Sequence, residues 1–135
     1  MGKLKWKYIS LLKDDTELEN IEIMYHFPIP SDLKECIKRY NAGVPSLTTY
    51  DIGTDKEKIF GGLLSYNKGD MDSFFDYVSI FEKSDKNSLN MFPFGLDPAG
   101  NFFCIENNKV VLYCHETDKT VVIAATFTEF LHMLY

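Results

Sequence analysis

The chain has 135 residues, enough for one domain that folds around a sizeable core without disulfides or metals. Its 14 basic and 20 acidic residues give a net charge of −6, which disfavours nucleic acid as a direct partner and favours a basic protein. No apolar run reaches the roughly 18–20 residues of a membrane span, and the odd number of cysteines argues against a secreted disulfide framework, so we expect a single cytoplasmic domain over residues 1–135 with no membrane partner.

The first elements predicted are a short strand and a helix. Residues 4–9 alternate apolar side chains with lysines, which is typical of an edge strand. Asp14 and Glu17 have the spacing of a capping box, and the apolar residues that follow them recur at helical intervals. A helix over about 15–25 is therefore expected.

A second helix is expected to begin at Ser31, just after two prolines. Its apolar stripe consists of Leu33, Cys36, Ile37 and Tyr40. Asn41 and Gly43 are residues that readily adopt the left-handed conformation in which helices often end. We expect them to stop this helix.

The middle of the chain is predicted to hold short strands and a third helix. One strand is expected near Thr48–Ile52, and residues 58–67 are strand-like around a Gly pair that can mark a bulge. The segment 69–83 has the spacing of a helix capped by Asp70. Its expected buried face consists of Met71, Phe74, Phe75, Val78 and Phe81.

The last third of the chain is predicted to form strands and one closing helix. The strands are expected over 89–94, 101–106, 109–115 and 119–125. The helix begins with a capping box at Thr126, and its apolar face consists of Phe127, Phe130, Leu131 and Leu134. This order of elements indicates an α+β fold with a mostly antiparallel sheet, a meander in its C-terminal half, flanked by helices.

The pair Asn107-Asn108 predicts the register of one hairpin. Both residues can adopt the positive φ of a type I′ turn. The opposed pairs are then Glu106 and Lys109, Ile105 and Val110, Cys104 and Val111, and Phe103 and Leu112. Both faces of these strands carry apolar side chains, so we expect the sheet to be covered on both sides, or covered on one side and used for binding on the other.

The cysteines and histidines do not have the spacing of a metal or nucleophile site. Cys114 and His115 are adjacent in a strand and point to opposite faces. The hairpin register also places Cys104 and Cys114 on opposite faces, which disfavours a disulfide. Cys36 lies on an apolar helix stripe, where a free cysteine acts as a small hydrophobic residue. The remaining histidines have no partner at metal-ligand spacing.

The loop Asp97-Pro98-Ala99-Gly100-Asn101 is the next candidate for a ligand site. Its oxygens could bind Ca²⁺, but it lacks the alternating acids of an EF-hand loop, and no Lys followed by Ser or Thr makes it a phosphate loop. We interpret it as a tight turn in which Asp97 binds its own backbone and Gly100 is left-handed.

Catalytic patterns are also missing from the sequence. No Gly-x-Ser-x-Gly, His-Glu-x-x-His, Cys-x-x-Cys or Gly-x-Gly-x-x-Gly motif occurs. Asp72 and Asp76 could pair on a helix, but exposed like charges at this spacing are typical of a solvated face. A hydrolase would need a polar cleft with a paired base and nucleophile. We therefore expect no enzyme, no cofactor and no metal.

Tyrosines and aspartates gather in the middle of the chain instead. Such residues are suited to binding a basic protein. The candidate partner-binding residues are Tyr50, Asp51, Tyr66, Asp70, Asp72 and Asp76. The alternative is that they are ordinary surface residues and packed tyrosines.

Three motifs follow one another in the order of a known family. In "FPIPSDLKECIKRYNAGVPS" the matching residues are Pro30, Leu33, Tyr40, Asn41 and Gly43. In "FPFGLDPAGNFFCIE" they are Pro93, Phe94, Asp97, Gly100, Asn101, Phe102 and Phe103. In "TFTEFLHML" they are Thr126, Phe127, Glu129, Phe130 and Leu131. Over roughly residues 15–135 the chain resembles the SUKH superfamily, and most strongly its Smi/Knr-like branch, named for yeast cell-wall synthesis regulators.

Two positions depart from the motifs of this family. Ile29 stands in place of the usual Leu before Pro30, and Ala42 replaces the first Gly of a Gly-Gly pair. The resemblance implies a central antiparallel sheet flanked by helices. It also implies that the shared residues serve the fold: Pro30, Asn41, Gly43, Pro93, Asp97, Gly100, Asn101 and Phe127.

The resemblance further implies a role without catalysis. Bacterial members are largely immunity proteins of polymorphic toxin systems, and each binds and neutralises a toxin domain, often a nuclease. We expect this chain to be such an antitoxin, acting by occlusion of a cognate, basic toxin domain. The alternative is a regulatory or scaffold module in cell-wall synthesis. The free edges of a small sheet would also permit a homodimer.

Overall fold

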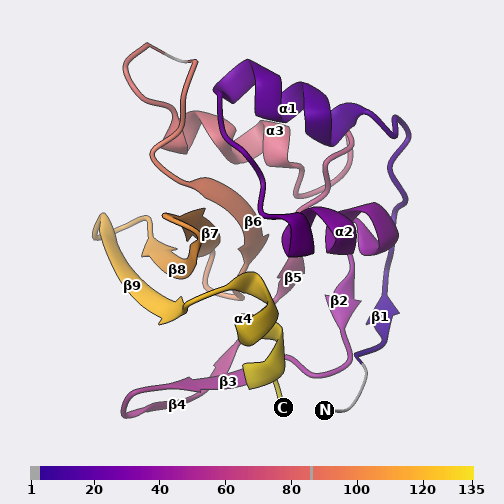
Figure 1. The fold of residues 1–135 in the computed structure, drawn as a ribbon. Helices are drawn as coiled ribbons and strands as arrows, with labels where there is room; N and C mark the ends of the chain where they lie inside the picture. The colour runs from indigo at the N-terminus through magenta and orange to yellow at the C-terminus, as the bar shows by residue number, and fades with distance from the viewer. Residues whose placement is uncertain (1–3, 86) are drawn as a thin grey trace.

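The computed structural model describes residues 4–85 and 87–135 (Figure 1). The helices are α1 (Glu17–Tyr25), α2 (Ser31–Tyr40), α3 (Phe74–Tyr77), which continues into the 3-10 turn η1 (Val78–Phe81), and α4 (Phe127–Met133). The strands are β1 (Trp6–Lys7), β2 (Val44–Pro45), β3 (Thr49–Ile52), β4 (Asp55–Ile59), β5 (Gly62–Leu63), β6 (Phe92–Leu96), β7 (Phe102–Glu106), β8 (Lys109–Cys114) and β9 (Lys119–Ala124). Within these ranges no helix has the length and apolar character needed to cross a membrane.

The main sheet is an antiparallel meander in the order β5-β6-β7-β8-β9, and β1–β2 and β3–β4 form separate two-stranded pairs. The hairpin between β7 and β8 confirms the predicted register, because Glu106 lies opposite Lys109. Asn107 and Asn108 have φ of 52° and 63°, as a type I′ turn requires. The α+β prediction is confirmed.

Both faces of the meander are covered at its central strand β7. On one face the Phe102 ring packs edge-on against Phe81 of η1, with 5.4 Å between ring centroids. On the other face Phe103 packs against Phe60 at 5.0 Å and against Phe130 of α4 at 5.4 Å. Of the two alternatives expected for this sheet, the structure shows the one in which both sides are buried (Figure 1).

The predicted closing helix is confirmed, whereas the capping box predicted for α1 is wrong. Thr126 caps α4, since its hydroxyl accepts a hydrogen bond of 3.0 Å from the backbone N–H of Glu129. Asp14 does not cap α1. Its carboxylate accepts instead from the N–H and hydroxyl of Thr16, two residues ahead, at 2.9 and 2.6 Å. A short Asp side chain forms this local turn in competition with a helix cap.

The helix predicted over 69–83 is wrong in its first third. It begins only at Phe74, and its cap is Ser73, whose hydroxyl accepts from the N–H of Phe75 at 3.2 Å. Residues 69–73 form a turn in which Asp72 has a positive φ of 53°. Met71, expected in the buried face, is therefore 88% exposed.

The strand-like segment 58–67 is divided between two sheets. Its first residues belong to β4, most of which was not predicted, because its sequence is charged and exposed rather than alternating. The chain leaves β4 at Phe60 and enters β5 at Gly62, which has a φ of 133° that favours glycine. The Gly pair thus marks a break between sheets.

The stop of α2 also differs from the expectation. Asn41 is extended, with φ −45° and ψ 132°, and the left-handed residue is Ala42, with a φ of 66°. Gly43 is required by close approach, since a Cβ there would lie 2.7 Å from the carbonyl oxygen of Tyr40. Ala42, which stands where the family motif has its first Gly, is thus the residue with a strained backbone.

We expect Ala42→Gly to stabilise the protein by about 0.5–1 kcal/mol, because relief of the left-handed strain outweighs the greater freedom of Gly in the unfolded chain. Urea unfolding measures this change. The matched control is Ala125→Gly, at an exposed position outside the positive-φ region, and it should lower the stability slightly. A loss of stability in Ala42→Gly as large as that of the control would contradict the strain.

Candidate functional site

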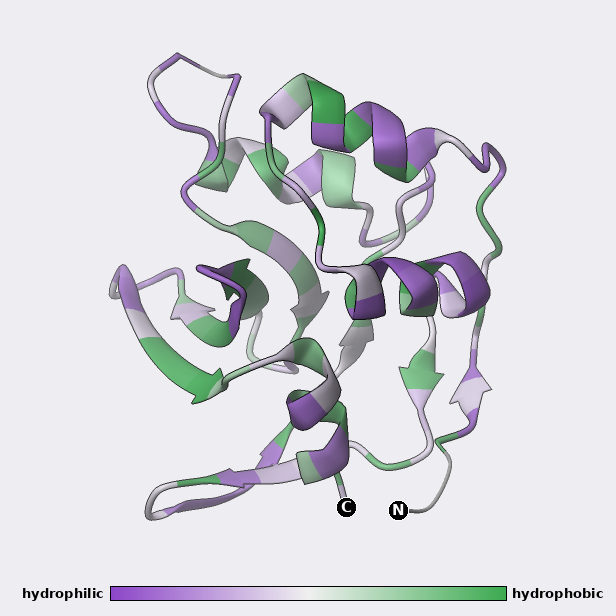
Figure 2. Cartoon of the chain, viewed as in Figure 1, coloured by the Kyte–Doolittle hydropathy of each residue, from purple (hydrophilic) through white to green (hydrophobic). Residues whose placement is uncertain are grey.

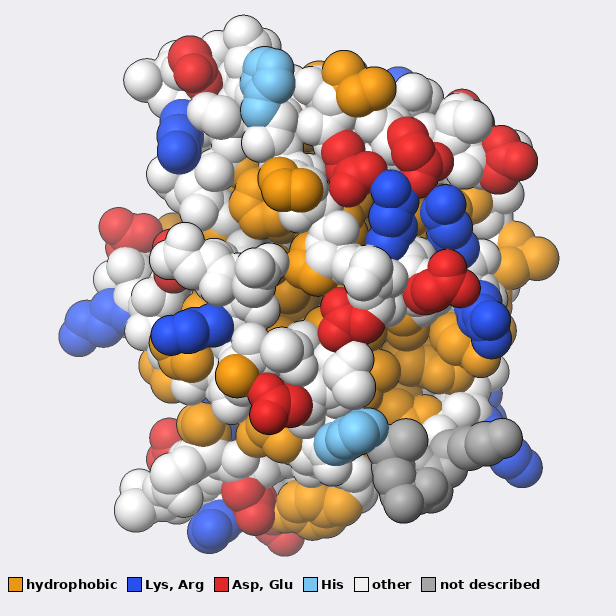
Figure 3. Space-filling model, viewed as in Figure 1, with side chains coloured by type: hydrophobic (Ala, Val, Ile, Leu, Met, Phe, Trp, Pro, Cys, Tyr) orange, Lys and Arg blue, Asp and Glu red, His pale blue; other side chains and the backbone are white. Residues whose placement is uncertain are grey.

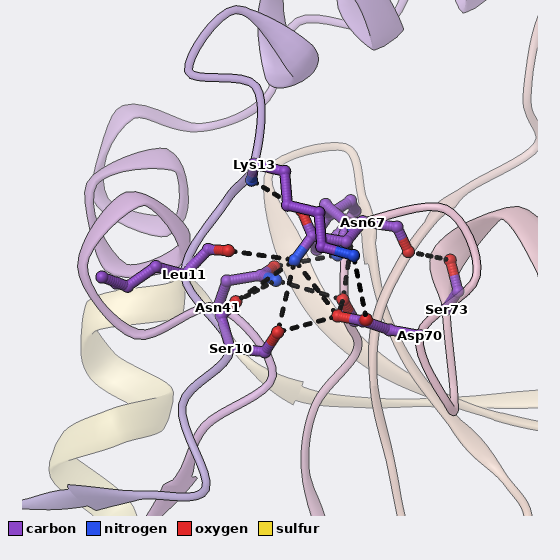
Figure 4. A network of polar contacts seen from close by, with 9 residues as sticks. Ser10, Leu11, Lys13, Asn41, Asn67, Asp70 and Ser73 are labelled. Atoms are coloured by element: carbon purple, nitrogen blue, oxygen red, sulfur yellow. Dashed lines mark hydrogen bonds and ion pairs between the residues drawn. The ribbon is translucent and has the colours of Figure 1, made fainter.

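A buried polar cluster, here called the Asn41 network, joins three segments of the chain (Figure 4). Its members are Ser10, Asn41, Ser65, Asn67, Asp70 and Ser73. They come from the segment before α1, the end of α2 and the turns between β5 and α3. The network determines how the turn before α3 is held.

Asn41 lies at the centre of this network and is fully buried. Its amide nitrogen donates to the carbonyl oxygen of Ser10 at 2.8 Å and to the hydroxyl of Ser65 at 3.1 Å. Its amide oxygen accepts from the backbone N–H of Tyr66 at 2.9 Å. Every bond goes to a group distant in sequence, so Asn41 acts as a cross-link rather than as a helix stop.

Asp70 accepts hydrogen bonds on one carboxylate oxygen from three donors. These are the hydroxyl of Ser65 at 2.7 Å, the hydroxyl of Ser10 at 2.9 Å and the amide of Asn67 at 3.1 Å. Donors to a carboxylate favour its charged form, and together they lower the pKa of Asp70, with a smaller contribution from Lys13. Asp70 therefore serves the fold, and its expected role as a helix cap is wrong.

The loop at Asp97 is the structural turn that was expected. One carboxylate oxygen of Asp97 accepts from the N–H groups of Ala99 and Asn101 at 2.9 and 2.8 Å, and the other accepts from the Asn101 amide at 3.0 Å. Gly100 has a φ of 85°. Both oxygens of the carboxylate thus accept hydrogen bonds within its own loop.

Tyr50 and Tyr66 are not surface residues. The prediction that they belong to a contact surface is therefore wrong. Both are fully buried. The ring of Tyr50 packs edge-on against Phe103 at 5.8 Å, and the hydroxyl of Tyr66 donates to the carbonyl oxygen of Pro93 at 2.8 Å. Their apolar rings stabilise the core, which leaves no atom for a partner. The Tyr50 hydroxyl has no hydrogen-bond partner among the described residues.

Asp51 lies apart from the other candidates. It belongs to β3, at the end of the molecule opposite α3 (Figure 1). Its carboxylate accepts from the hydroxyl of Tyr135 at 2.7 Å, which lowers the pKa of Asp51. The six candidate residues therefore do not form one surface.

Asp72 and Asp76 remain, and both are exposed, Asp72 in the turn before α3 and Asp76 within α3. The hydroxyl of Tyr77 donates to Asp72 at 2.8 Å, and this bond raises the pKa of Tyr77. Neither carboxylate has a Lys or Arg partner among the residues that the structure describes. With the exposed side chain of Met71 these residues form the α3 surface, defined as Met71, Asp72, Asp76 and Tyr77.

Two acids of the neighbouring helix α1, Glu19 and Glu22, differ from those of the α3 surface because lysines of α2 pair with them. Lys34 of α2 lies 2.6 Å from Glu22 and 2.9 Å from Glu19 of α1, and Lys38 lies 3.2 Å from Glu19. Figure 3 shows basic and acidic side chains side by side over α1 and α2. The α3 surface is thus a place where negative charge remains unpaired.

A hollow of about 390 Å³ adjoins the α3 surface. Its lining includes Met71, Asp72, Val44, Leu96 and Asp97. The hollow combines apolar walls with carboxylates. Sequence reasoning missed Met71 because it assigned residue 71 to a helix face; the turn-forming Gly69-Asp70 just before it was the available signal.

The described residues contain no group of three or more His, Cys, Asp or Glu side chains arranged to hold a metal ion. Burial raises the pKa of Cys36 to about 12 and raises that of Cys104 well above its usual range. Such thiols remain protonated and act as apolar groups.

The model of the SMI1/KNR4 family (SUKH-1) matches residues 14–133. No curated protein and no solved structure matches the chain. The family match spans the α3 surface and every member of the Asn41 network except Ser10.

We expect Asp70→Asn to lower the stability at neutral pH but not in acid. The folded-state pKa of Asp70 is lowered, so its contribution is present above the unfolded value of about 4 and is lost as the pH falls through the folded value. Urea unfolding between about pH 3 and pH 7 should show the two proteins converging at low pH. Asp76→Asn, on the exposed side of α3, is the control. A difference between Asp70→Asn and the natural chain that is the same at every pH would contradict this assignment.

Proposed function

The chain belongs to the SMI1/KNR4 family (SUKH-1), and we propose that it is an immunity protein that binds and neutralises a cognate toxin domain. The mode of action is occlusion: the chain covers the working surface of the toxin and performs no catalysis of its own. It needs no metal or cofactor for this role.

The α3 surface is the observation that carries the proposal. It presents two exposed carboxylates without a basic partner in the described residues, beside the ring of Tyr77 and the side chain of Met71. Carboxylates steer a basic protein toward the surface, while aromatic and thioether groups supply apolar contact. The adjoining hollow can accept a side chain of the partner.

The net charge of −6 supports a basic toxin, of which a nuclease domain is the kind we propose. A nuclease binds phosphates through basic residues, so an acidic protein competes for the same surface. Three free cysteines suit action in the cytoplasm, where thiols stay reduced.

The Asn41 network makes the α3 surface suitable for tight binding. It anchors Asp70 and Ser73 on either side of Asp72, so the turn is ordered before a partner arrives. A surface that is already ordered loses less conformational entropy on binding. The family residue Asn41 thus supports a surface whose own side chains can differ between members.

The experiment pairs the chain with a toxin domain encoded beside its gene. Co-expression should protect cells from that toxin, and Asp72→Lys with Asp76→Lys should weaken binding by at least about tenfold. Each substitution changes the charge by two units, so the net charge rises from −6 to −2. Calorimetry at two salt concentrations measures the affinity.

The matched control is Asp55→Lys with Glu57→Lys in β4, which changes the net charge equally at the other end of the molecule (Figure 1). It should leave the affinity nearly unchanged. Equal weakening by both double variants would show that only overall charge matters and would remove the α3 surface from the interface. Absence of protection would count against immunity and favour the regulatory or scaffold role.

A further inference from the structure

Strand β9 is an open edge of the main sheet. It is the last strand in the order β5-β6-β7-β8-β9, and no strand lies beyond it among the described residues. Its outer side therefore presents unpaired backbone N–H and C=O groups, which another strand can bind. β9 lies at the outside of the molecule in Figure 1 and ends in a strongly hydrophobic stretch in Figure 2.

The opposite edge of this sheet is closed. β5 has only two residues, and the N–H of Leu63 donates to the carbonyl oxygen of Gly43 at 2.9 Å. A Cβ at Gly62 would lie 2.9 Å from Val44, so β2 lies directly against β5. Among the described residues β9 is thus the only open edge of this sheet, and copies of the chain can extend it by joining one β9 to another. Such an arrangement uses the same patch on both copies, so the assembly is a closed dimer that cannot grow further.

The exposed side chains of β9 suit a strand partner. Val121 is 46% exposed and Val122 is 55% exposed, and their side chains lie on opposite faces of the strand. β-branched residues pair well across neighbouring strands. Charged residues and bulges are features by which natural proteins prevent edge strands from pairing with other chains. Of these, β9 has one charged residue, Lys119, and a bulge at Ile123.

We propose that this edge is a homodimer interface, in which β9 of two copies pairs antiparallel about a two-fold axis at Val121. Opposed residues in an antiparallel pair must both point their backbone groups toward the partner or both away. The residue numbers of the two members of each opposed pair then differ by an even number. The axis must therefore pass through a residue rather than between two.

The bulge selects the residue on the axis. The register between β8 and β9 shifts at Ile123, so the regular run of β9 is Lys119–Val122. An axis at Val121 pairs Thr120 with Val122 of the second copy inside this run. In this register the bulged Ile123 lies at the end of the pairing, opposite Lys119, whereas an axis at Val122 would place it directly beside the axis, opposite Val121.

Charge does not oppose this register. Val121 of one copy faces Val121 of the other, and Lys119 of each copy faces Ile123 of the other. The two Lys119 side chains are then separated by roughly 13 Å along the strands, beyond the screening length at physiological salt. No acidic residue lies between Lys119 and Ala124, although the whole chain is acidic. The paired run is short, so we expect a weak dimer with a Kd on the order of 10–100 µM.

Sedimentation velocity over about 5–500 µM, spanning this Kd, tests the proposal. The natural chain should shift from monomer to dimer. Val121→Lys and Val121→Glu should each remain monomeric, because like charges would face each other across the axis. An equimolar mixture of the two variants should dimerise again, since Lys then faces Glu. Ile23→Lys, at a position in α1 that is 74% exposed, is the control and should dimerise like the natural chain.

A natural chain that stays monomeric throughout this range would overturn the proposal. Dimerisation that survives Val121→Lys, or that the mixture fails to restore, would overturn the β9 register. Circular dichroism and thermal unfolding of each variant show that it is folded, which the half-exposed position of Val121 leads us to expect. The outcome is independent of toxin binding, which depends on α3.

Discussion

The side-chain amide of Asn41 is fully buried and bonds the backbone of Ser10 and Tyr66 and the hydroxyl of Ser65. A buried amide satisfied in this way costs little, whereas its removal leaves several polar groups without partners in a low-dielectric interior. Because α2, the N-terminal segment and the turn before α3 all meet at this amide, their mutual positions depend on it.

This arrangement separates the residues that maintain the fold from those available to a partner. Asn41, Gly43 and Asp97 are held by internal bonds or close contacts. Among the described residues the exposed carboxylate of Asp76 has no such bond and that of Asp72 accepts only one, from Tyr77, so these side chains are less constrained. A family can therefore keep one scaffold while its members bind different partners, as the proposed immunity role requires. The open edge at β9 is a second surface, with a different chemistry: backbone groups and valines instead of charge.

Much of the fold could be predicted because its signals are local. The Asn107-Asn108 turn determines a whole hairpin register, and Thr126 caps the helix three residues from the N–H it binds. The candidate site was predicted less well because its bonds are distant: Asp70 binds Ser10, 60 residues away, and no local pattern reveals that partner. Burial of Tyr50 likewise depends on packing between separate elements, since a tyrosine suits either a core or a surface.

The unfolding free energy of Asn41→Ala tests the central role of this amide most directly. We expect a loss of about 3–4 kcal/mol, because three hydrogen bonds disappear and buried groups are left unpaired. Asn90→Ala, at an exposed position, should change the stability by no more than about 0.5 kcal/mol. A loss below about 1 kcal/mol in Asn41→Ala would contradict the dependence of the fold on this residue.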